Sequence, residues 1–475
     1  MLRPVKILLA LMLLPVLVGA QTNSEKVALV GGRVIDGTGR PPIENGVVLI
    51  YGGRIRAVGK KAINKAGQVI VENARVQDDT GNIFAVSKEA AVLVPPDARQ
   101  VDVTGKTLMP TLVDLHTHLG QTINGLDPSP DAYNEQNIRA QLAHLLAYGV
   151  GTIAVMGTDH DLIYPLSEEQ QAGELPGAQF YTAGRGFGAK GGAPGGAGAA
   201  WDVYRPVTPE EARAEVRELA AHHPSYVKIW VDDSYGRAPK MPPEVYRAII
   251  EEAHRHQLRV LAHVYYLADA KSLLAAGVDG LAHSVRDQPV DQELIAALKA
   301  RNVIYLATLV RDESTFAYAG PPAWLGDAFF QAGLLPGVLE KLQSTEFRAH
   351  AAADRDLARN RASLTMAEKN LKTLIQAGVR VGFGTDAGMP SRFLGYFEHR
   401  ELQLMVEAGL TPMQAIMCAT HNAANFLSHD FGTLEPGQRA DILVLDANPL
   451  EDIHNTEKIA AIWQAGKPLK PLTAK

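Results

Sequence analysis

One strand-like stretch of the sequence reads Leu108-Met109-Pro110-Thr111-Leu112-Val113-Asp114-Leu115-His116-Thr117-His118. Its apolar run is typical of a buried parallel strand, and its polar end is where such a strand leaves the core. Alternate residues of a strand share a face, so His116 and His118 can point together beyond the strand. Two imidazoles on one face suit a borderline metal such as Zn²⁺. A His-x-His pair alone also occurs by chance, or as polar residues that end a strand.

Working outward from this stretch, β-rich runs alternate with helical stretches over residues 108–430. Eight strands separated by helices predict a chain of class α/β that closes into a parallel (β/α)₈ barrel of the TIM type. Barrels of this kind keep their active sites at the carboxyl ends of the strands. The expected strands are 108–118, 152–156, 178–183, 226–231, 259–265, 280–285, 303–309 and 379–386.

The two ends of the chain show a different, strand-rich pattern. Residues 21–107 carry short apolar runs punctuated by glycine, and residues 75–100 interrupt that rhythm as an inserted loop or hairpin. After the last helix, residues 441–445 and 459–463 resume the strand pattern. We therefore expect one small composite β-domain, built from residues 21–107 and 431–475.

The first twenty residues have the three parts of a secretory signal peptide. Arg3 and Lys6 precede an apolar run, and Gly19-Ala20 stands before Gln21. A membrane anchor is the alternative, but the run has about a dozen residues, whereas a spanning helix needs about 20. The prediction is a protein exported to the periplasm or secreted, with no membrane-spanning segment once the leader is removed.

Charge and cysteine content indicate which binding partners and which stabilising interactions to expect. The formal net charge is -6, and no Lys/Arg run could follow a phosphate backbone, so nucleic acid is not expected as a partner. Cys418 is the only cysteine, which leaves no internal disulfide. Packing and bound metal must therefore stabilise the fold, and the expected partner is a small-molecule substrate. A homo-oligomer is compatible with the sequence.

Further ligand-type residues stand at the ends of other expected strands. Lys228 lies in the fourth strand, His263 near the end of the fifth, His283 in the sixth and Asp386 at the tip of the eighth. Each of them alone is commonly a hydrogen-bonded structural group. Together with the His-x-His pair they would converge at one mouth of the barrel, which predicts a metal centre.

Lys228 needs its own explanation, because an ammonium group beside metal cations is strongly disfavoured and a buried lysine tends to its neutral form. A neutral amine can capture CO₂. The carbamate that results is an anion with two oxygens, able to bridge two metals about 3.5 to 4 Å apart.

At these residues the chain resembles the amidohydrolase superfamily, in its imidazolonepropionase-like and prolidase-like branch. The resemblance runs from about Val27 to the C-terminus, and in combination and order the motifs are highly specific. They are Met109 to His118, Tyr226-Val227-Lys228-Ile229, Ala262-His263-Val264-Tyr265-Tyr266, Ala282-His283-Ser284-Val285-Arg286-Asp287, Gly382-Phe383-Gly384-Thr385-Asp386-Ala387 and Gly432-Thr433-Leu434-Glu435-Pro436-Gly437.

The resemblance implies a site with two divalent metal ions, for which zinc is the expected metal. His116, His118 and Asp386 would hold one ion, His263 and His283 the other, and carboxylated Lys228 would bridge them. A metal-bridging hydroxide would attack the substrate, with Asp386 taking its proton and passing it to the leaving amine.

Tyr265 is a candidate hydrogen-bond donor to the developing oxyanion, because it lies two residues after a predicted ligand and so on the same strand face. Packing at the barrel rim is the alternative for Tyr265, and Tyr266 is expected to face the other way. Arg286 and Arg311 are candidates to clamp a substrate carboxylate. Structural ion pairs, with Asp287 or Asp312, are the alternative for these arginines.

The predicted activity is hydrolysis of a C–N bond in a dipeptide or an N-acyl amino acid. Hydrolysis of a cyclic amide, a lactone or a phosphoester at the same metal pair is the alternative. A metal-binding protein without activity is disfavoured, because all six expected ligand positions are filled.

Residues 184–200 are rich in glycine and alanine and predict a mobile loop, either a lid over the barrel mouth or a passive connector. Prolidase-like relatives place a histidine after the Gly-Gly pair of this loop. Here Gly191-Gly192 is followed by Ala193 and Pro194, so substrate contacts from this loop are not carried over.

Overall fold

The computed structural model describes residues 25–195 and 202–469. All eight expected barrel strands are present, each overlapping its expected range, and they run parallel to their neighbours. They are β9 (Leu112–Thr117), β10 (Val150–Val155), β11 (Gln179–Thr182), β12 (Val227–Trp230), β13 (Val260–His263), β14 (Gly280–Ala282), β15 (Ile304–Leu306) and β16 (Val381–Gly382).

These strands form two arcs, one of three strands in the order β11-β10-β9 and one of five in the order β12 to β16. Several backbone hydrogen bonds outside the regular ladders join the arcs at both edges. Leu115 donates to the carbonyl of Phe383 (2.9 Å), and Ser225 donates to the carbonyl of Thr182 (2.9 Å). The architecture is therefore TIM-barrel-like, and one continuous closed ladder stays a prediction.

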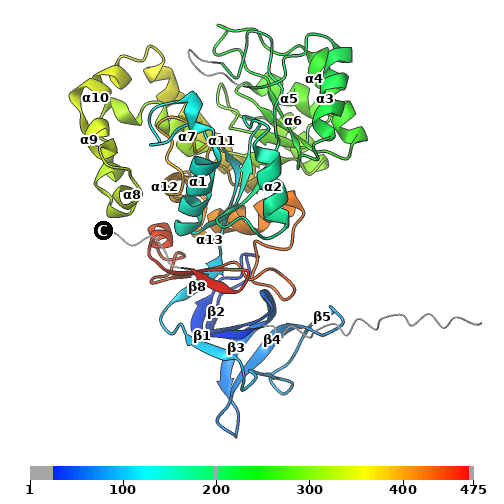
Figure 1. Ribbon diagram of the computed structural model, residues 1–475, viewed down its shortest axis with the longest axis vertical. Coiled ribbons are helices and arrows are strands. Elements are labelled where there is room, and N and C mark those ends of the chain that lie inside the picture. The colour runs from blue at the N-terminus through cyan, green and yellow to red at the C-terminus, as the bar shows by residue number, and fades with distance from the viewer. Residues whose placement is uncertain (1–24, 196–201, 470–475) are drawn as a thin grey trace, which may run out of the picture.

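Helices cover the outside of these strands (Figure 1). Their starts are set by capping residues: Thr208 accepts from the backbone N–H of Glu211, and Asp291 accepts from that of Leu294. The helices after the first six strands are α1 (Glu135–Ala147), α2 (Ile163–Gln171), α3 (Pro209–Ala220), α4 (Pro243–Arg255), α5 (Leu267–Ala276) and α6 (Gln292–Ala300).

The connection from β15 to β16 is a long helical excursion, seen in yellow at one side of Figure 1. It comprises α7 (Leu309–Ser314), α8 (Ala328–Ala332), α9 (Val338–Gln343), α10 (Thr345–Ala352) and α11 (Leu357–Gln376). Three further helices follow β16, namely α12 (Tyr396–Glu407), α13 (Pro412–Met417) and α14 (Ala423–Leu427).

The buried core lies on both sides of the barrel strands. One cluster packs the strands against the surrounding helices. Another takes residues from most of the strands, among them Val113, Ala154, Leu261 and Ile304, together with Phe426 of α14. Apolar packing on both faces fixes the strand ends, and the strand ends carry the candidate site.

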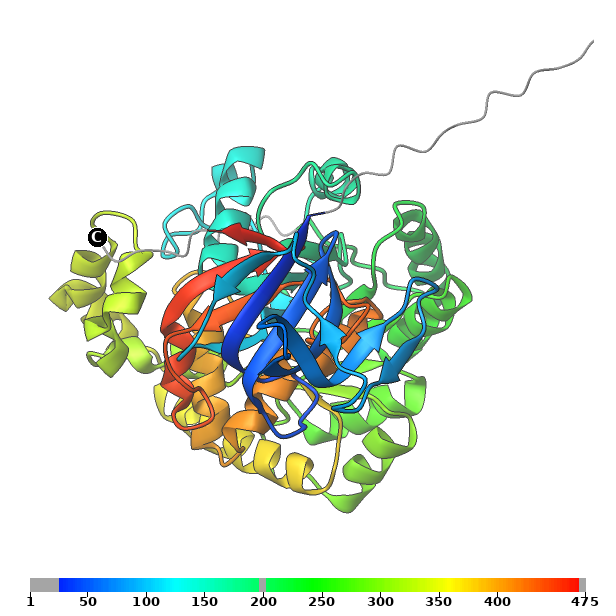
Figure 2. The same ribbon diagram turned by 90° about the horizontal axis from the view of Figure 1, so that it is seen from below.

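Strands from both chain ends lie in one eleven-stranded sheet, which Figure 2 shows across one end of the barrel. Its main order is β19-β18-β17-β8-β1-β2-β3-β4-β5, with β6 on β4 and β7 on β1. The bounds are β1 (Lys26–Val34), β2 (Ile43–Tyr51), β3 (Arg54–Ile63), β4 (Val69–Gln77), β5 (Ile83–Ala85), β6 (Val92–Leu93), β7 (Arg99–Asp102), β8 (Thr107–Pro110), β17 (Ile442–Leu445), β18 (Ile459–Gln464) and β19 (Lys467–Leu469). The expected insertion at 75–100 thus consists of the end of β4 and short strands that pair with this sheet. The domain boundaries expected at residues 107/108 and 430/431 stay a prediction.

The first predicted barrel strand, 108–118, is two strands in two different sheets. β8 pairs with β17, with Met109 opposite Leu443, whereas β9 pairs with β10. Pro110, the last residue of β8, has no N–H to donate, and the chain then changes partners: Thr111 donates to Asp441 and Leu112 to Gly149. The apolar run is continuous, so its pattern alone could not show the change of sheet.

The loop expected to be mobile forms hydrogen bonds with the rest of the protein over its described part, residues 184–195. Phe187 is buried, and it exchanges backbone hydrogen bonds with β12: its N–H donates to Lys228 and its carbonyl accepts from Trp230. The Arg205 guanidinium donates to four carbonyls of the loop, those of Ala189, Gly192, Ala193 and Pro194. The rest of the loop, 196–200, and the predicted signal peptide lie outside the described residues. Across the described ranges, no helix has the length and apolar character needed to cross a membrane.

Candidate metal centre

Five of the predicted ligands lie at or just after the carboxyl ends of strands β9, β13, β14 and β16, and the sixth, Lys228, lies within β12. All six are buried, with at most 8% of each residue exposed. In β9 the register shifts, because the step from Asp114 to Thr117 faces the shorter step from Ile153 to Val155. Such a bulge re-aims side chains, and here the two unpaired residues are Leu115 and His116, the first histidine of the His-x-His pair.

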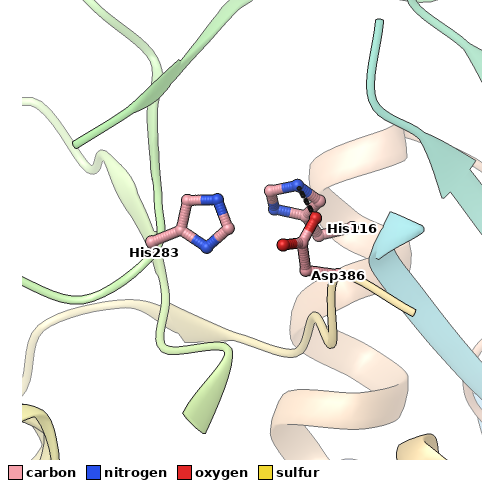
Figure 3. A group of neighbouring side chains, drawn as sticks. All are labelled: His116, His283 and Asp386. Atoms are coloured by element: carbon pink, nitrogen blue, oxygen red, sulfur yellow. Dashed lines mark ion pairs between the residues drawn. The ribbon is translucent and has the colours of Figure 1, made fainter. Parts of the chain in front are cut away.

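One half of the centre is formed by His116, His118 and Asp386. The Oδ1 atom of Asp386 lies 3.2 Å from Nε2 of His116 and 2.8 Å from Nε2 of His118. Figure 3 shows the side chain of His283 facing those of His116 and Asp386. Ligand atoms of His116, His283 and Asp386 all lie within 4.8 Å of one another, which is close enough to share one cation.

The other half is formed by His263 and His283. Their ring centroids lie 4.4 Å apart, and the ring of His283 lies 4.5 Å from that of His116. Nε2 of His263 shares a hydrogen bond of 2.8 Å with Asp232, so Nδ1 is its free ligand atom. Metal-ligating histidines commonly use their second nitrogen in this way, bound to a carboxylate or another acceptor.

Two threonines orient imidazoles in the same manner. Nδ1 of His118 lies 2.8 Å from Oγ1 of Thr158, and Nδ1 of His283 lies 2.7 Å from Oγ1 of Thr308. Each threonine therefore turns the Nε2 atom of its histidine towards the centre. Sequence reasoning missed Thr158, Thr308 and Asp232, although each lies within four residues after the end of a barrel strand.

The backbone at the centre is strained. His283, Thr308 and Asp386 have positive φ angles of 85°, 49° and 61°, in the region that disfavours residues with a Cβ. Gly388 has φ +92°, and a Cβ there would lie 1.8 Å from the carbonyl oxygen of His118. Conformations of this kind cost about 1 to 3 kcal/mol each and persist where the surroundings fix them, commonly at functional sites.

Lys228 is fully buried, and its Nζ atom has no hydrogen-bond partner. Nζ lies 5.3 Å from the ring centroid of Trp230. Burial lowers the pKa of Lys228 to about 7, although the nearby charge of Asp386 acts in the opposite direction. The amine is therefore ready to lose its proton near neutral pH, as the carbamate hypothesis requires.

The histidines are neutral ligands in this environment. Burial lowers the pKa of His263 to about 4 and that of His116 well below the ordinary value. Burial alone would raise the pKa of Asp386, but Arg392 and His116 more than offset it, so this carboxyl stays ionised. Neutral imidazoles beside an ionised carboxylate are the protonation states that divalent cations need.

The residues present fit divalent cations. Nδ1 of His116 and Nζ of Lys228 are both buried without a hydrogen-bond partner. Most buried polar atoms in proteins have one. Nitrogen ligands with one carboxylate suit zinc and its first-row neighbours. The two unpartnered nitrogen atoms are therefore consistent with a bound group, such as a metal ion, that is not part of the polypeptide.

Tyr265 lies beyond the end of β13, so the strand alternation used to orient it does not apply. Its hydroxyl shares a hydrogen bond of 3.0 Å with Ser363 on α11, and its ring packs edge-on against Tyr235. Tyr265 and Tyr266 both line a cavity of about 430 Å³, so Tyr266 does not simply face away. The oxyanion role of Tyr265 stays a prediction.

The two candidate clamp arginines meet at one carboxylate. Nε of Arg286 and Nη1 of Arg311 lie 3.1 and 2.7 Å from Oδ1 of Asp312. Arg286 also donates to the carbonyls of Val264 and Ser284. Both arginines thus pair with Asp312, whereas Asp287, the partner expected for Arg286, accepts from the backbone N–H of Leu267 at 2.9 Å. The substrate clamp stays a prediction. A third arginine, Arg392, forms an ion pair with Asp386 and was not found from the sequence.

Comparison with known proteins places this geometry in a family. A model described as "Amidohydrolase family" matches residues 107–473. The ochratoxinase of Aspergillus niger is 29% identical over 276 residues, which are 55% of this chain and 49% of that protein, so the match spans about half the length of this curated relative.

Solved structures agree in fold. A Xaa-Pro dipeptidase with bound methionine in its active site superposes with a TM-score of 0.68 at 22% identity, covering 94% of this chain and 100% of that one. The A. niger ochratoxinase structure gives 0.67 at 22% identity, with 94% and 96% covered. Since the family model covers most of the sequence, the chain belongs to the amidohydrolase family.

Proposed function

We propose that the protein hydrolyses a C–N bond of a small substrate, such as a dipeptide or an N-acyl amino acid, with two divalent cations, expected to be zinc. The observation that carries this proposal is the unpartnered amine of Lys228, fully buried beside imidazoles and a carboxylate. The names of the ochratoxinase and Xaa-Pro dipeptidase relatives support an amide or peptide substrate.

His116, His118 and Asp386 would hold one cation, and His263 and His283 the other. Lys228 would lie between them as a carbamate, formed when its neutral amine adds to CO₂ and releases one proton. When bound, the two cations supply Lewis acidity towards the scissile carbonyl and activate water as the nucleophile.

The side chains supply the proton transfer and the positioning. Oδ1 of Asp386 faces the histidines, whereas Oδ2 faces Arg311 and Arg392. Asp386 is therefore placed to accept the proton of the attacking water and to pass it to the leaving amine. Thr158 and Thr308 keep the imidazoles in one orientation, and the burial of the whole centre strengthens its electrostatic interactions.

The test uses a chain that starts at Gln21, purified with Zn²⁺ and bicarbonate. It is assayed against dipeptides, N-acyl amino acids, lactams, lactones and phosphoesters. We expect hydrolysis of at least one dipeptide or N-acyl amino acid, loss of that activity with a chelator, and its return with Zn²⁺. Zinc-dependent turnover of lactones or phosphoesters alone would favour the alternative chemistry, and no zinc-dependent turnover would reject the proposal.

Export is a separate proposal, because the leader lies outside the described residues. Its support is the tripartite pattern of residues 1–20. A full-length chain expressed in a Gram-negative host should appear in the periplasmic fraction with its N-terminus near Gln21. A cytoplasmic protein that keeps Met1 would contradict export.

A further inference from the structure

Thr308 occupies the position that usually caps a helix, but its hydroxyl does not cap α7. The residue before a helix commonly accepts a hydrogen bond from a backbone N–H of the first turn through its side chain. Thr308 makes no such bond, and its hydroxyl lies 2.7 Å from Nδ1 of His283 instead. The backbone N–H groups at the start of α7 therefore need another acceptor.

That acceptor is Glu401, a residue of α12. Its Oε1 accepts from the N–H of Leu309 at 3.0 Å, and its Oε2 accepts from the N–H of Val310 at 2.7 Å. Both oxygens are thus used, and only 1% of the residue is exposed. A carboxyl group from another helix replaces the cap that Thr308 would otherwise supply, which leaves the hydroxyl of Thr308 free for the histidine.

The surroundings of Glu401 give no other reason for an acid at this position. Among the described residues it forms no ion pair, and the charged groups that act on it, Asp114 and Asp312, are acidic as well. A buried carboxylate beside two other carboxyls is unfavourable, so shape alone would favour a glutamine. A glutamine has one acceptor oxygen, and its NH₂ group would face a second donor, whereas a carboxylate serves both N–H groups.

The backbone of Thr308 needs to be held in place. Its φ and ψ angles are 49° and 48°, in the left-handed region that a β-branched residue rarely adopts. On one side Ser284, the residue after His283, donates its N–H (3.2 Å) and its hydroxyl (3.0 Å) to the carbonyl of Ala307. On the other side Glu401 holds the start of α7. Such a conformation persists only where its surroundings fix it, so the loss of one anchor would let the hydroxyl of Thr308 turn away from His283.

We propose that Glu401 is a positioning residue of the metal centre, which holds the hydroxyl of Thr308 on His283 by capping α7 in its place. This inference rests on the metal centre of the proposed function. The hydrogen bond at Nδ1 directs Nε2 of His283 towards the cation expected at His263 and His283. Glu401 should therefore affect the affinity for this cation without contacting it.

The test measures metal affinity, which needs no turnover. Metal-free wild type, Glu401→Gln and Thr308→Val are titrated with Zn²⁺ in bicarbonate against a chromophoric chelator, and the Co²⁺-loaded proteins are compared by visible absorption. We expect each variant to bind one of the two ions about 10- to 100-fold less tightly, the usual cost of losing an outer-shell partner, and both to show the same altered Co²⁺ spectrum. Thr308→Ser, which keeps the hydroxyl, should stay within about threefold of wild type.

A double variant separates positioning from an effect on stability. If both residues act through the same hydrogen bond, adding Glu401→Gln to Thr308→Val should weaken zinc binding by no more than about a further threefold. Effects that multiply would overturn the inference, and so would unchanged zinc affinity in a Glu401→Gln protein with a lowered melting temperature. If Glu401→Gln does not fold, Glu401→Asp takes its place, because its shorter side chain keeps the charge but cannot reach both N–H groups.

Glu398→Gln is the matched control, because it changes the other fully buried glutamate of α12. It should leave zinc affinity within twofold of wild type. An equal loss in Glu398→Gln would show a general effect of altering α12 and would also overturn the inference.

The outcomes separate this inference from the proposed function. If wild type binds two zinc ions with the expected dependence on Glu401 but hydrolyses no C–N substrate, the inference stands and the proposed function fails. If wild type hydrolyses such a substrate and Glu401→Gln keeps its zinc affinity, the inference fails and the proposed function stands. A wild-type protein that binds no zinc would contradict both.

Discussion

Lys228 and Glu398 are both fully buried, and neither has a hydrogen-bond partner for its charged end. Their surroundings differ. Lys228 lies within β12 near imidazoles and Asp386, whereas Glu398 lies on α12 near the carboxyl of Asp114. Burial and then the neighbouring Asp114 raise the pKa of Glu398 well above its usual range.

The difference shows that an unpartnered buried group is not by itself a sign of function. Protonation removes the buried charge of Glu398, because the neutral carboxyl is the favoured form beside another carboxyl. Protonation has the opposite effect on Lys228, since it would create a buried charge. Burial therefore disfavours the ammonium form and leaves a neutral amine among metal-type ligands. The lysine needs an added group, and the glutamate does not.

The largest effect is expected from Lys228→Ala. Loss of the bridging group should reduce zinc below two ions per chain and lower turnover by more than the roughly 10- to 100-fold that outer-shell partners cost. Added propionate should restore part of both, because a small carboxylate can take the place of the carbamate. Lys341→Ala is the surface control. Full zinc loading with normal turnover in Lys228→Ala would show that Lys228, like Glu398, is a buried group without a role in the site.

Asp386→Asn should keep most of the fold and lose most of the turnover, by about 10² to 10⁴-fold. An amide neither accepts a proton nor ligates metal as well as a carboxylate. Steady-state kinetics and circular dichroism of the zinc-treated variant provide the measurement. If the rate is unchanged in a folded variant, Asp386 is not the proton acceptor.

The stability of the metal-free protein should depend on pH through Lys228. Its pKa is near 7 in the folded chain against 10.5 for an ordinary lysine, so between these values only the unfolded chain binds the proton. Stability should therefore rise with pH through this window and fall as pH drops towards 7, by up to about 2.7 kcal/mol over two pH units. Urea denaturation at pH 7, 8 and 9 in CO₂-free buffer, for wild type and Lys228→Met, tests this. Parallel curves for the two proteins would show that Lys228 is not the group responsible.

The smallest effect is expected from Glu398→Gln. The side chain is already neutral, so the free energy of unfolding at pH 7 should change by less than about 1 kcal/mol. Zinc content and kcat should stay within twofold of wild type. The matched control is Glu407→Gln, at the exposed end of the same helix. A loss of zinc or turnover confined to Glu398→Gln would make Glu398 part of the site and remove the distinction from Lys228.

The sequence predicted the barrel strands because apolar β-rich runs and helices alternate clearly. It did not predict that residues 108–118 change sheets at Thr111, since β8 and β9 are equally apolar and only their partners differ. It also did not predict that residues 184–195 are held in place by hydrogen bonds. Glycine-rich composition suggested freedom there, whereas hydrogen bonds from Arg205, a residue outside that segment, fix the backbone.

For the site, the sequence located the residues that stand at strand ends, where topology alone brings them together. Residues such as Thr158 and Thr308 act through one hydrogen bond each and resemble ordinary loop residues in sequence. Arg392 lies six residues after Asp386 in an irregular segment, and nothing in the local pattern indicates that the chain folds back to pair them.

The most direct test of the two-metal centre is a zinc titration of metal-free protein in bicarbonate, with bound zinc measured by elemental analysis and turnover measured at each step. The account predicts saturation at two zinc ions per chain in wild type, with full turnover only after the second ion, and at one or fewer in Lys228→Ala. Saturation at a single ion with full turnover, or equal zinc binding by both proteins, would contradict it.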